Sequence, residues 1–197
     1  MPSSVRRLTA LDHERLVRLL RRMCTPGPGQ DRWRAEFVGL LRAHRHAERD
    51  VVIGELVADV EQLAGAAREQ AAADVALDEL AADAAVLAPD HPDLDRWAEQ
   101  ARLLLDRHSQ SWAESLMVPL EGLIARRELR RLGGAYETRR EEELSGAGVA
   151  PAPPRRLDLS RAELYELARR AGIEGRSSMT RGQLIDELQR HQGEGPH

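Results

Sequence analysis

The amino-acid sequence predicts an all-α protein: an up-down four-helix bundle with a short helical extension and a small C-terminal helix-loop-helix domain. Arg, Glu, Ala and Leu dominate the composition and favour helices, whereas β-branched residues are sparse. Apolar residues recur at helical spacing in four long segments that are joined by short connections. Because aromatic residues are few, the core must be mainly aliphatic.

The first predicted helix extends to about Met23. Its start is indicated by Thr9 and Asp12, which have the spacing of a capping box. His13 lies on the apolar face of this helix, because leucines follow it three and seven residues later. The Pro- and Gly-rich residues 24–30 end the helix.

The second predicted helix runs from Asp31 to about Gly54 and carries the most informative pattern. A helix advances about 100° per residue, which places His44 and Glu48 in the middle of the apolar stripe of this helix. Unpaired polar groups in such a place cost several kcal/mol, so the pair needs a structural or functional reason. His46 falls on the opposite, solvated side.

The third and fourth predicted helices differ in the side chains that they direct toward the core. The third, residues 57–87, is rich in Ala and has no histidine, but Glu69 falls on its predicted inward face. The fourth places His108 on the same apolar face as Trp112. Pro119 is expected to break or kink this fourth helix, because Pro lacks the backbone donor and its ring crowds the preceding turn.

The helical pattern continues to residue 144, with an interruption expected at Gly133 and Gly134. A Pro-, Gly- and Ala-rich stretch then separates a second helical unit, whose two helices have capping signals that begin at Ser160 and Thr180. The predicted organisation is a bundle with its extension (1–144), a flexible linker (145–156), a helix-loop-helix domain (157–191) and a disordered tail (192–197).

Charge and composition exclude several classes of protein. The net charge of −4 and a pI near 6.0 give no global attraction to nucleic acid or anionic membranes. The single Cys excludes an internal disulfide and a thiolate metal cage. The first residues lack the apolar core of a signal peptide, and no apolar run approaches the length of about 18 residues that a membrane helix needs. We therefore expect a cytoplasmic protein with no membrane partner.

Three of the four predicted helices direct a histidine inward: His13, His44 and His108. Glu48 adds a carboxylate, and Glu69 is a further candidate. Helix bundles hold metals in their cores with side chains from facing helices. Because imidazole nitrogen and carboxylate oxygen suit iron, zinc or manganese, these residues are candidate metal ligands.

This pattern resembles the hemerythrin-like (HHE) family over about residues 9–144. The resemblance is carried by LTALDHERL, by LLRAHRHAERDVV with His44 and Glu48, and by the helix of His108. It implies an oxo-bridged di-iron centre that binds oxygen, or that senses oxygen, iron, nitric oxide or peroxide. The chain departs from the family at the third helix, which offers Ala where a histidine is usual, and at Trp112, which replaces a ligand.

Three interpretations of the candidate ligands follow. For a standard di-iron site, the chain lacks several of the required ligands. A reduced mononuclear site could use His13, His44, Glu48 and His108, with Glu69 as an additional candidate. In a metal-free bundle, Glu48 would instead hydrogen-bond His13 or His44 in a buried cluster. The missing ligands favour this metal-free cluster, and iron is the expected cofactor if a metal binds.

The C-terminal domain resembles the helical module at the N-terminus of the transcription-termination factor Rho, and SAP-like modules. The resemblance is carried by LSRAELYELARRAGIEGRSSMTRGQLIDELQR, and it implies contact with nucleic acid. The phosphates of a nucleic acid could contact the helix N-termini and the side chains of Arg161, Arg176 and Arg181. Residues 155–194 hold eight Arg against seven acidic residues, which predicts weak, salt-sensitive binding. A protein-docking module is the alternative.

We expect a non-enzymatic regulatory or stress-related protein, with the bundle as sensor or scaffold and the C-terminal domain as a tether to nucleic acid. The first alternative is an iron-binding protein that reacts with or senses oxygen or peroxide. The second is a metal-free interaction scaffold that binds a protein partner or a second copy of the chain. Hydrolysis and phosphoryl transfer are not expected, because the sequence has no Ser–His–acid pattern and no Gly-rich phosphate loop.

Overall fold

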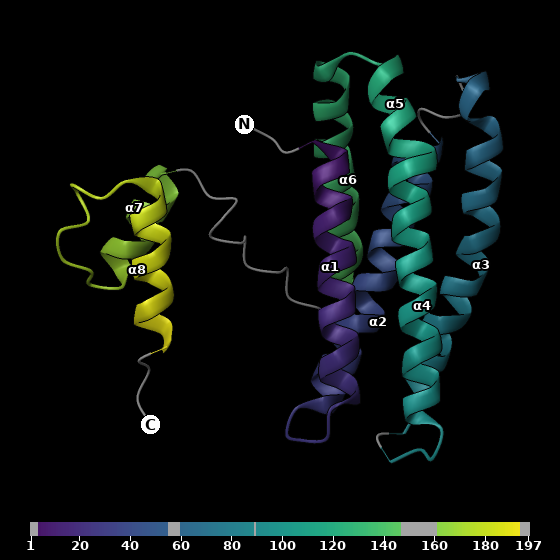
Figure 1. Ribbon diagram of the computed structural model, residues 1–197, viewed down its shortest axis with the longest axis horizontal. Helices are drawn as coiled ribbons and strands as arrows, with labels where there is room; N and C mark the ends of the chain where they lie inside the picture. The colour runs from purple at the N-terminus through teal and green to yellow at the C-terminus, as the bar shows by residue number, and fades with distance from the viewer. Residues whose placement is uncertain (1–3, 55–59, 89, 147–160, 194–197) are drawn as a thin grey trace. The chain divides into compact units, whose positions relative to one another are not determined.

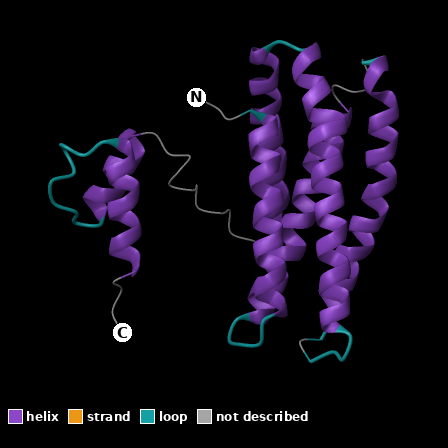
Figure 2. Cartoon of the chain, viewed as in Figure 1, coloured by secondary structure: helices purple, strands orange, loops and turns teal. Residues whose placement is uncertain are grey.

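All regular elements of the computed structural model are helices, over the residues that it describes: 4–54, 60–88, 90–146 and 161–193 (Figures 1 and 2). The predicted all-α class is therefore confirmed. The chain forms two compact units, Met1–Pro151 and Ala152–His197. The helices of the first unit are α1 (Val5–Cys24), α2 (Gln30–Ala47), α3 (Ala64–Val86), α4 (Leu94–Ser111), α5 (Val118–Leu123) and α6 (Arg126–Gly146).

The helices α1 to α4 form a four-helix bundle in which neighbours along the chain run antiparallel (Figure 1). α1 packs against α2 and α4, and α3 packs against the same two helices, so the four close a ring. α6 lies outside this ring, against α1 and α2. α5 continues the direction of α4, and a short turn then leads the chain back into α6 (Figure 1).

The core of the bundle contains a polar layer between two apolar clusters. One cluster includes Leu16 and Phe37, and the other includes Val52 and Trp112. Along each of the four helices, buried polar residues fall between the members of these clusters. These polar residues are Thr9, Asp12, His13, His44, Arg45, Glu48, Gln70, Asp74 and His108. Because burial of polar groups is costly, this polar layer is the part of the core that packing alone does not explain.

α1 begins before the predicted capping box. Its first residue is Val5, with Ser4 in an extended conformation at the N-cap position. Thr9 and Asp12 consequently lie inside the helix, where both are buried. The prediction that they cap the helix was wrong, because the same short polar side chains also serve as buried hydrogen-bond partners.

The predicted inward face of α3 was shifted. Glu69 is exposed, whereas Gln70 and Asp74 are buried in the polar layer. The many alanines make α3 apolar on most of its circumference, so its sequence gives little contrast between an inner and an outer face. Glu69 therefore lies outside the group of residues that could hold a metal.

Two predicted helix interruptions do not end a helix. α6 runs through Gly133 and Gly134 without a break, and Gly133 is buried. The fourth helix continues past Pro119 as α5, after a π-helical segment, Trp112–Met117. The wider π-helical turn contains Ser115, whose carbonyl lies four residues before Pro119 and would be crowded by its ring in a regular α-helix.

The second unit contains α7 (Arg161–Arg170) and α8 (Arg181–Gly193). The capping box at the start of α8 is confirmed. The backbone N–H of Thr180 donates to Gln183 Oε1 at 2.8 Å, and the N–H of Gln183 donates to Thr180 Oγ1 at 3.3 Å. The matching signal at Ser160 lies outside the described residues.

The helices extend slightly beyond their predicted ends. α6 reaches Gly146 and α8 reaches Gly193, two residues into the predicted linker and the predicted tail. The remaining parts of those two segments, 147–156 and 194–197, lie outside the described residues. Within the described ranges, none of the helices combines the length and the hydropathy that crossing a bilayer requires.

Candidate metal centre

Four side chains meet in the middle of the polar layer. His13 comes from α1, His44 from α2 and His108 from α4. Glu48 begins a π-helical segment, Glu48–Ile53, that continues α2. Each residue offers one ligand atom, and these atoms all lie within 4.8 Å of one another. Since the most exposed of the four residues is only 7% exposed, this group could hold a metal ion away from bulk water.

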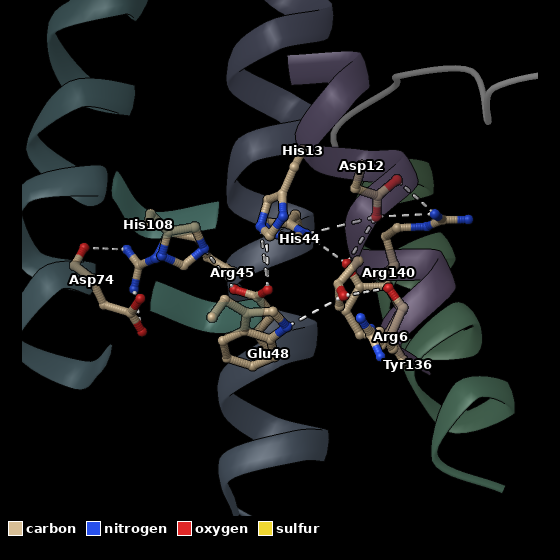
Figure 3. A network of polar contacts seen from close by, with 12 residues as sticks. Arg6, Asp12, His13, His44, Arg45, Glu48, Asp74, His108, Tyr136 and Arg140 are labelled. Atoms are coloured by element: carbon tan, nitrogen blue, oxygen red, sulfur yellow. Dashed lines mark hydrogen bonds and ion pairs between the residues drawn. The ribbon is translucent and has the colours of Figure 1, made fainter. Parts of the chain in front are cut away.

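The carboxylate of Glu48 lies among the three imidazole rings (Figure 3). Its Oε1 atom is 3.2 Å from His44 Nε2 and 3.6 Å from His13 Nε2. Its Oε2 atom is 3.2 Å from His108 Nε2. The rings stand edge to face, with centroids 4.6 to 5.8 Å apart. The Nε2 atoms of all three histidines thus converge on one carboxylate.

These short contacts are not aligned as hydrogen bonds. Neither oxygen of Glu48 has a hydrogen-bond partner among the described residues. The same is true of the Nε2 atoms of His13, His44 and His108. The hydrogen bonds from His13 or His44 to Glu48 that were expected in a metal-free bundle are therefore not made. Buried polar atoms without a partner are rare and call for an explanation such as a bound ion.

Among the buried carboxylates of the polar layer, only Glu48 has no arginine partner among the described residues. Asp12 contacts Arg140 at 2.8 Å, and Asp74 contacts Arg45 at 3.2 Å. Among the described residues, Glu48 makes ion-pair contacts only with histidines. A buried carboxylate requires a cation, either a protonated side chain or a metal. Glu48 is thus the point of the core where a cation is most favoured.

The histidines differ in their protonation. Burial, together with the neighbouring His44 and His108, holds the pKa of His13 well below its usual value, so His13 is neutral near pH 7. Burial also opposes the charge on His44, but the carboxylates of Glu48 and Asp12 outweigh it and raise the pKa of His44. A proton therefore competes with a metal ion for His44.

α2 and α4 each pass into a π-helical segment one turn after their candidate histidine ligand. One π-helical segment begins at Glu48, four residues after His44. The other begins at Trp112, four residues after His108. π-helical turns are rare and are often found at functional sites. The first of them carries a candidate ligand, and the second carries the aromatic wall of the centre.

Trp112 closes one side of the centre. Its ring stacks on His108, with 6.1 Å between centroids, and its Nε1–H donates to Thr9 Oγ1 at 3.3 Å. Trp112 is 1% exposed. The helical register predicted that Trp112 faces the same space as His108, and the stacking confirms it.

Three residues that were not among the predicted site residues support the Nδ1 side of the His44 ring: Tyr136, Asp12 and Arg140. The Nδ1 atom of His44 lies 2.6 Å from Tyr136 Oη, and the Tyr136 hydroxyl donates to Asp12 Oδ2 at 2.8 Å (Figure 3). Arg140 Nη1 donates to both carboxylate oxygens of Asp12, at 2.8 and 3.0 Å. The available signal was weak: Tyr136 and Arg140 stand four apart, on one face of an otherwise highly charged helix.

A groove of about 430 Å³ lies beside His13, between α1 and α4. It is lined by residues that include Val17 from α1 and Leu105, Asp106 and Ser109 from α4. His13 lines the groove and is also the most exposed of the four candidate ligands. The groove therefore borders one candidate ligand of the centre.

Two of the arginines predicted to contact nucleic acid also stabilise the second unit. Arg161 donates to two carbonyls of the loop between α7 and α8, each at 3.0 Å. Arg176 donates to the Ile173 carbonyl at 2.8 Å. Arg181 is exposed at the start of α8. Contact with nucleic acid stays a prediction for all three arginines.

No family model, curated protein or solved structure matches this chain. The resemblances to the hemerythrin-like family and to the Rho N-terminal module therefore stay predictions from the residues that carry them. The geometry of the polar layer is the stronger basis for a functional proposal.

Proposed function

We propose that the first unit is a metal-binding domain, which holds one divalent transition-metal ion with His13, His44, Glu48 and His108. The observation that carries the proposal is the convergence of three imidazole nitrogens and two carboxylate oxygens, all buried and without a hydrogen-bond partner among the described residues. A bound cation would satisfy these atoms together and would neutralise Glu48.

The donor set favours zinc, iron or manganese. Imidazole nitrogen suits these metals, whereas calcium and magnesium prefer oxygen ligands throughout. In a tetrahedral site with bonds of about 2.1 Å, neighbouring ligand atoms lie about 3.4 Å apart. Glu48 Oε1 lies 3.2 Å from His44 Nε2 and 3.6 Å from His13 Nε2, close to that spacing, and the candidate ligand atoms all lie within 4.8 Å of one another.

The composition of the polar layer favours one ion over two. The other buried carboxylates, Asp12 and Asp74, are already paired with Arg140 and Arg45. Because Arg45 contacts both Asp74 and Asp78, Asp74 already has a cation partner and is not free to bind a second metal ion. Of the three interpretations of the sequence, the mononuclear site has the best support.

We infer that the centre serves sensing or regulation, as the resemblance to the hemerythrin-like family implies, with iron as the natural metal. A bound iron ion would supply redox or Lewis-acid chemistry. The groove beside His13 would admit a small ligand such as oxygen, nitric oxide or peroxide. Trp112, which stacks on His108, and the apolar cluster around it would exclude water from that part of the centre. The C-terminal module would then tether this sensor to a nucleic acid or a protein.

Metal content tests this proposal. The full chain, loaded with Fe²⁺ without oxygen or with Zn²⁺ and then desalted, should retain about one ion per chain. His44→Ala removes a central ligand and should retain less than about 0.1 ion per chain. The matched control is His46→Ala, because His46 is half-buried, lies outside the group of candidate ligands and contacts Glu143 instead.

Two results would contradict the proposal. Retention below about 0.1 ion per wild-type chain with every metal would show that the cluster binds none. Equal retention by the wild type and His44→Ala would place the ion elsewhere on the chain.

A further inference from the structure

We propose that Tyr136, on α6 outside the four-helix bundle, is a positioning residue that holds His44 ready to bind the metal. The inference rests on the proposed function, because it concerns a ligand of the same centre. Its consequence is that metal occupancy and the packing of α6 against the bundle are coupled.

The direction of the hydrogen bonds around Tyr136 determines which nitrogen of His44 carries a proton. The carboxylate of Asp12 can only accept, and it accepts two hydrogen bonds from Arg140. The Tyr136 hydroxyl has a single proton and donates it to Asp12, so its oxygen must accept from Nδ1–H of His44. With the proton on Nδ1, the Nε2 atom that faces Glu48 is the nitrogen left to bind a metal.

His44 is distinguished by this support. The Nδ1 atom of His108 has no hydrogen-bond partner among the described residues. Metal-binding histidines almost always donate their second ring N–H to an acceptor, which fixes the orientation of the ring and the tautomer. His44 is thus the ligand whose orientation is set before the ion arrives, and Tyr136 is the group that sets it.

Most of the hydrogen-bonded support for His44 comes from α6. Tyr136 is fully buried within the apolar cluster that also contains Leu132 and Trp112. Arg140 lies one turn later on the same face of α6 and holds Asp12 from the other side. Two of the three residues behind His44 therefore belong to a helix outside the bundle. If a docked α6 strengthens metal binding, then metal binding must by linkage favour the docked α6.

A Tyr136→Phe variant tests the inference, because it removes the hydroxyl and keeps the ring. We expect its zinc affinity, measured by competition with a chromophoric chelator, to fall by about 10- to 100-fold. Arg140→Gln should weaken zinc binding in the same direction, because it releases Asp12. Tyr165→Phe, in the second unit, is the matched control and should bind zinc as the wild type does.

Two further measurements separate positioning from a general effect on folding. In the zinc-loaded wild type, ¹⁵N NMR should show His44 coordinated through Nε2 with a proton on Nδ1, and Tyr136→Phe should shift the Nδ1 resonance. Hydrogen exchange of the wild type should show slower exchange of the α6 amides around Tyr136 when zinc is bound. The second measurement needs no variant.

The possible failures of the two proposals are distinguishable. A zinc affinity of Tyr136→Phe within about threefold of the wild type would overturn this inference and leave the proposed function intact. Hydrogen exchange of the α6 amides that does not change when zinc binds would also overturn this inference and leave the proposed function intact. A wild-type chain that binds no zinc would overturn the proposed function itself.

Discussion

A Glu48→Gln variant is expected to lower the zinc affinity of the bundle by more than about 100-fold, since losing even a residue behind a ligand costs about 10- to 100-fold. Glu48 contacts all three histidines of the centre, and its carboxylate supplies the negative charge that attracts the ion. A neutral amide of nearly the same shape leaves the packing intact but is a poor metal ligand. Competition titration with a zinc chelator measures the loss.

Glu69→Gln is the matched control for this substitution. Glu69 lies on α3, is exposed, and stands outside the group of candidate ligands, so its replacement should leave zinc affinity unchanged. If Glu48→Gln bound zinc as tightly as the wild type, the carboxylate of Glu48 would not be a ligand.

Removal of the metal is expected to lower the stability of the first unit. An ion that binds only the folded state stabilises it by about 2.7 kcal/mol when its free concentration is 100 times the dissociation constant. For a domain of this size, each kcal/mol corresponds to about 2–4 °C in Tm. Saturating zinc should therefore raise the Tm of the first unit by about 5–10 °C, and EDTA should reverse the rise. Calorimetry of the full chain measures both.

The same calorimetry on Glu48→Gln identifies the site of stabilisation. Zinc should not shift the Tm of this variant, because the variant no longer binds the ion in the polar layer. A zinc-dependent rise of equal size in both proteins would contradict the assignment.

The inward direction of the ligands could be predicted because helical periodicity is a local property. His13, His44 and His108 each share a face with apolar residues within two turns, and each is buried. The bundle follows from the same pattern, because short connections bring successive helices together as antiparallel neighbours. Glu48 was found in the same way, by its place four residues after His44.

The contribution of α3 could not be predicted, because alanines occupy both its buried and its exposed positions and do not mark an inward face. Glu69 and Gln70 are neighbours that point about 100° apart on a helix. A small error in the assumed inward direction therefore exchanges one for the other. The structure buries Gln70, which donates to Ser111 Oγ at 2.8 Å, and leaves Glu69 exposed.

The support behind His44 was beyond prediction because it depends on tertiary packing. Tyr136 is 92 residues from His44 and 124 residues from Asp12 in the sequence. The charged pattern of α6 does not indicate that this helix packs against α1 and α2 at the level of the polar layer. Asp12 was assigned to a helix cap, because a local pattern with Thr9 fits that role equally well.

X-ray absorption spectroscopy of the zinc-loaded chain tests the proposed centre most directly. We predict about three imidazole nitrogens at about 2.0–2.1 Å and a carboxylate oxygen at about 2.0–2.2 Å from the ion. The histidines His13, His44 and His108 would supply the nitrogens, and Glu48 would supply the oxygen. A shell of oxygen atoms alone, or a sulfur at about 2.3 Å contributed by Cys24, would contradict the assignment.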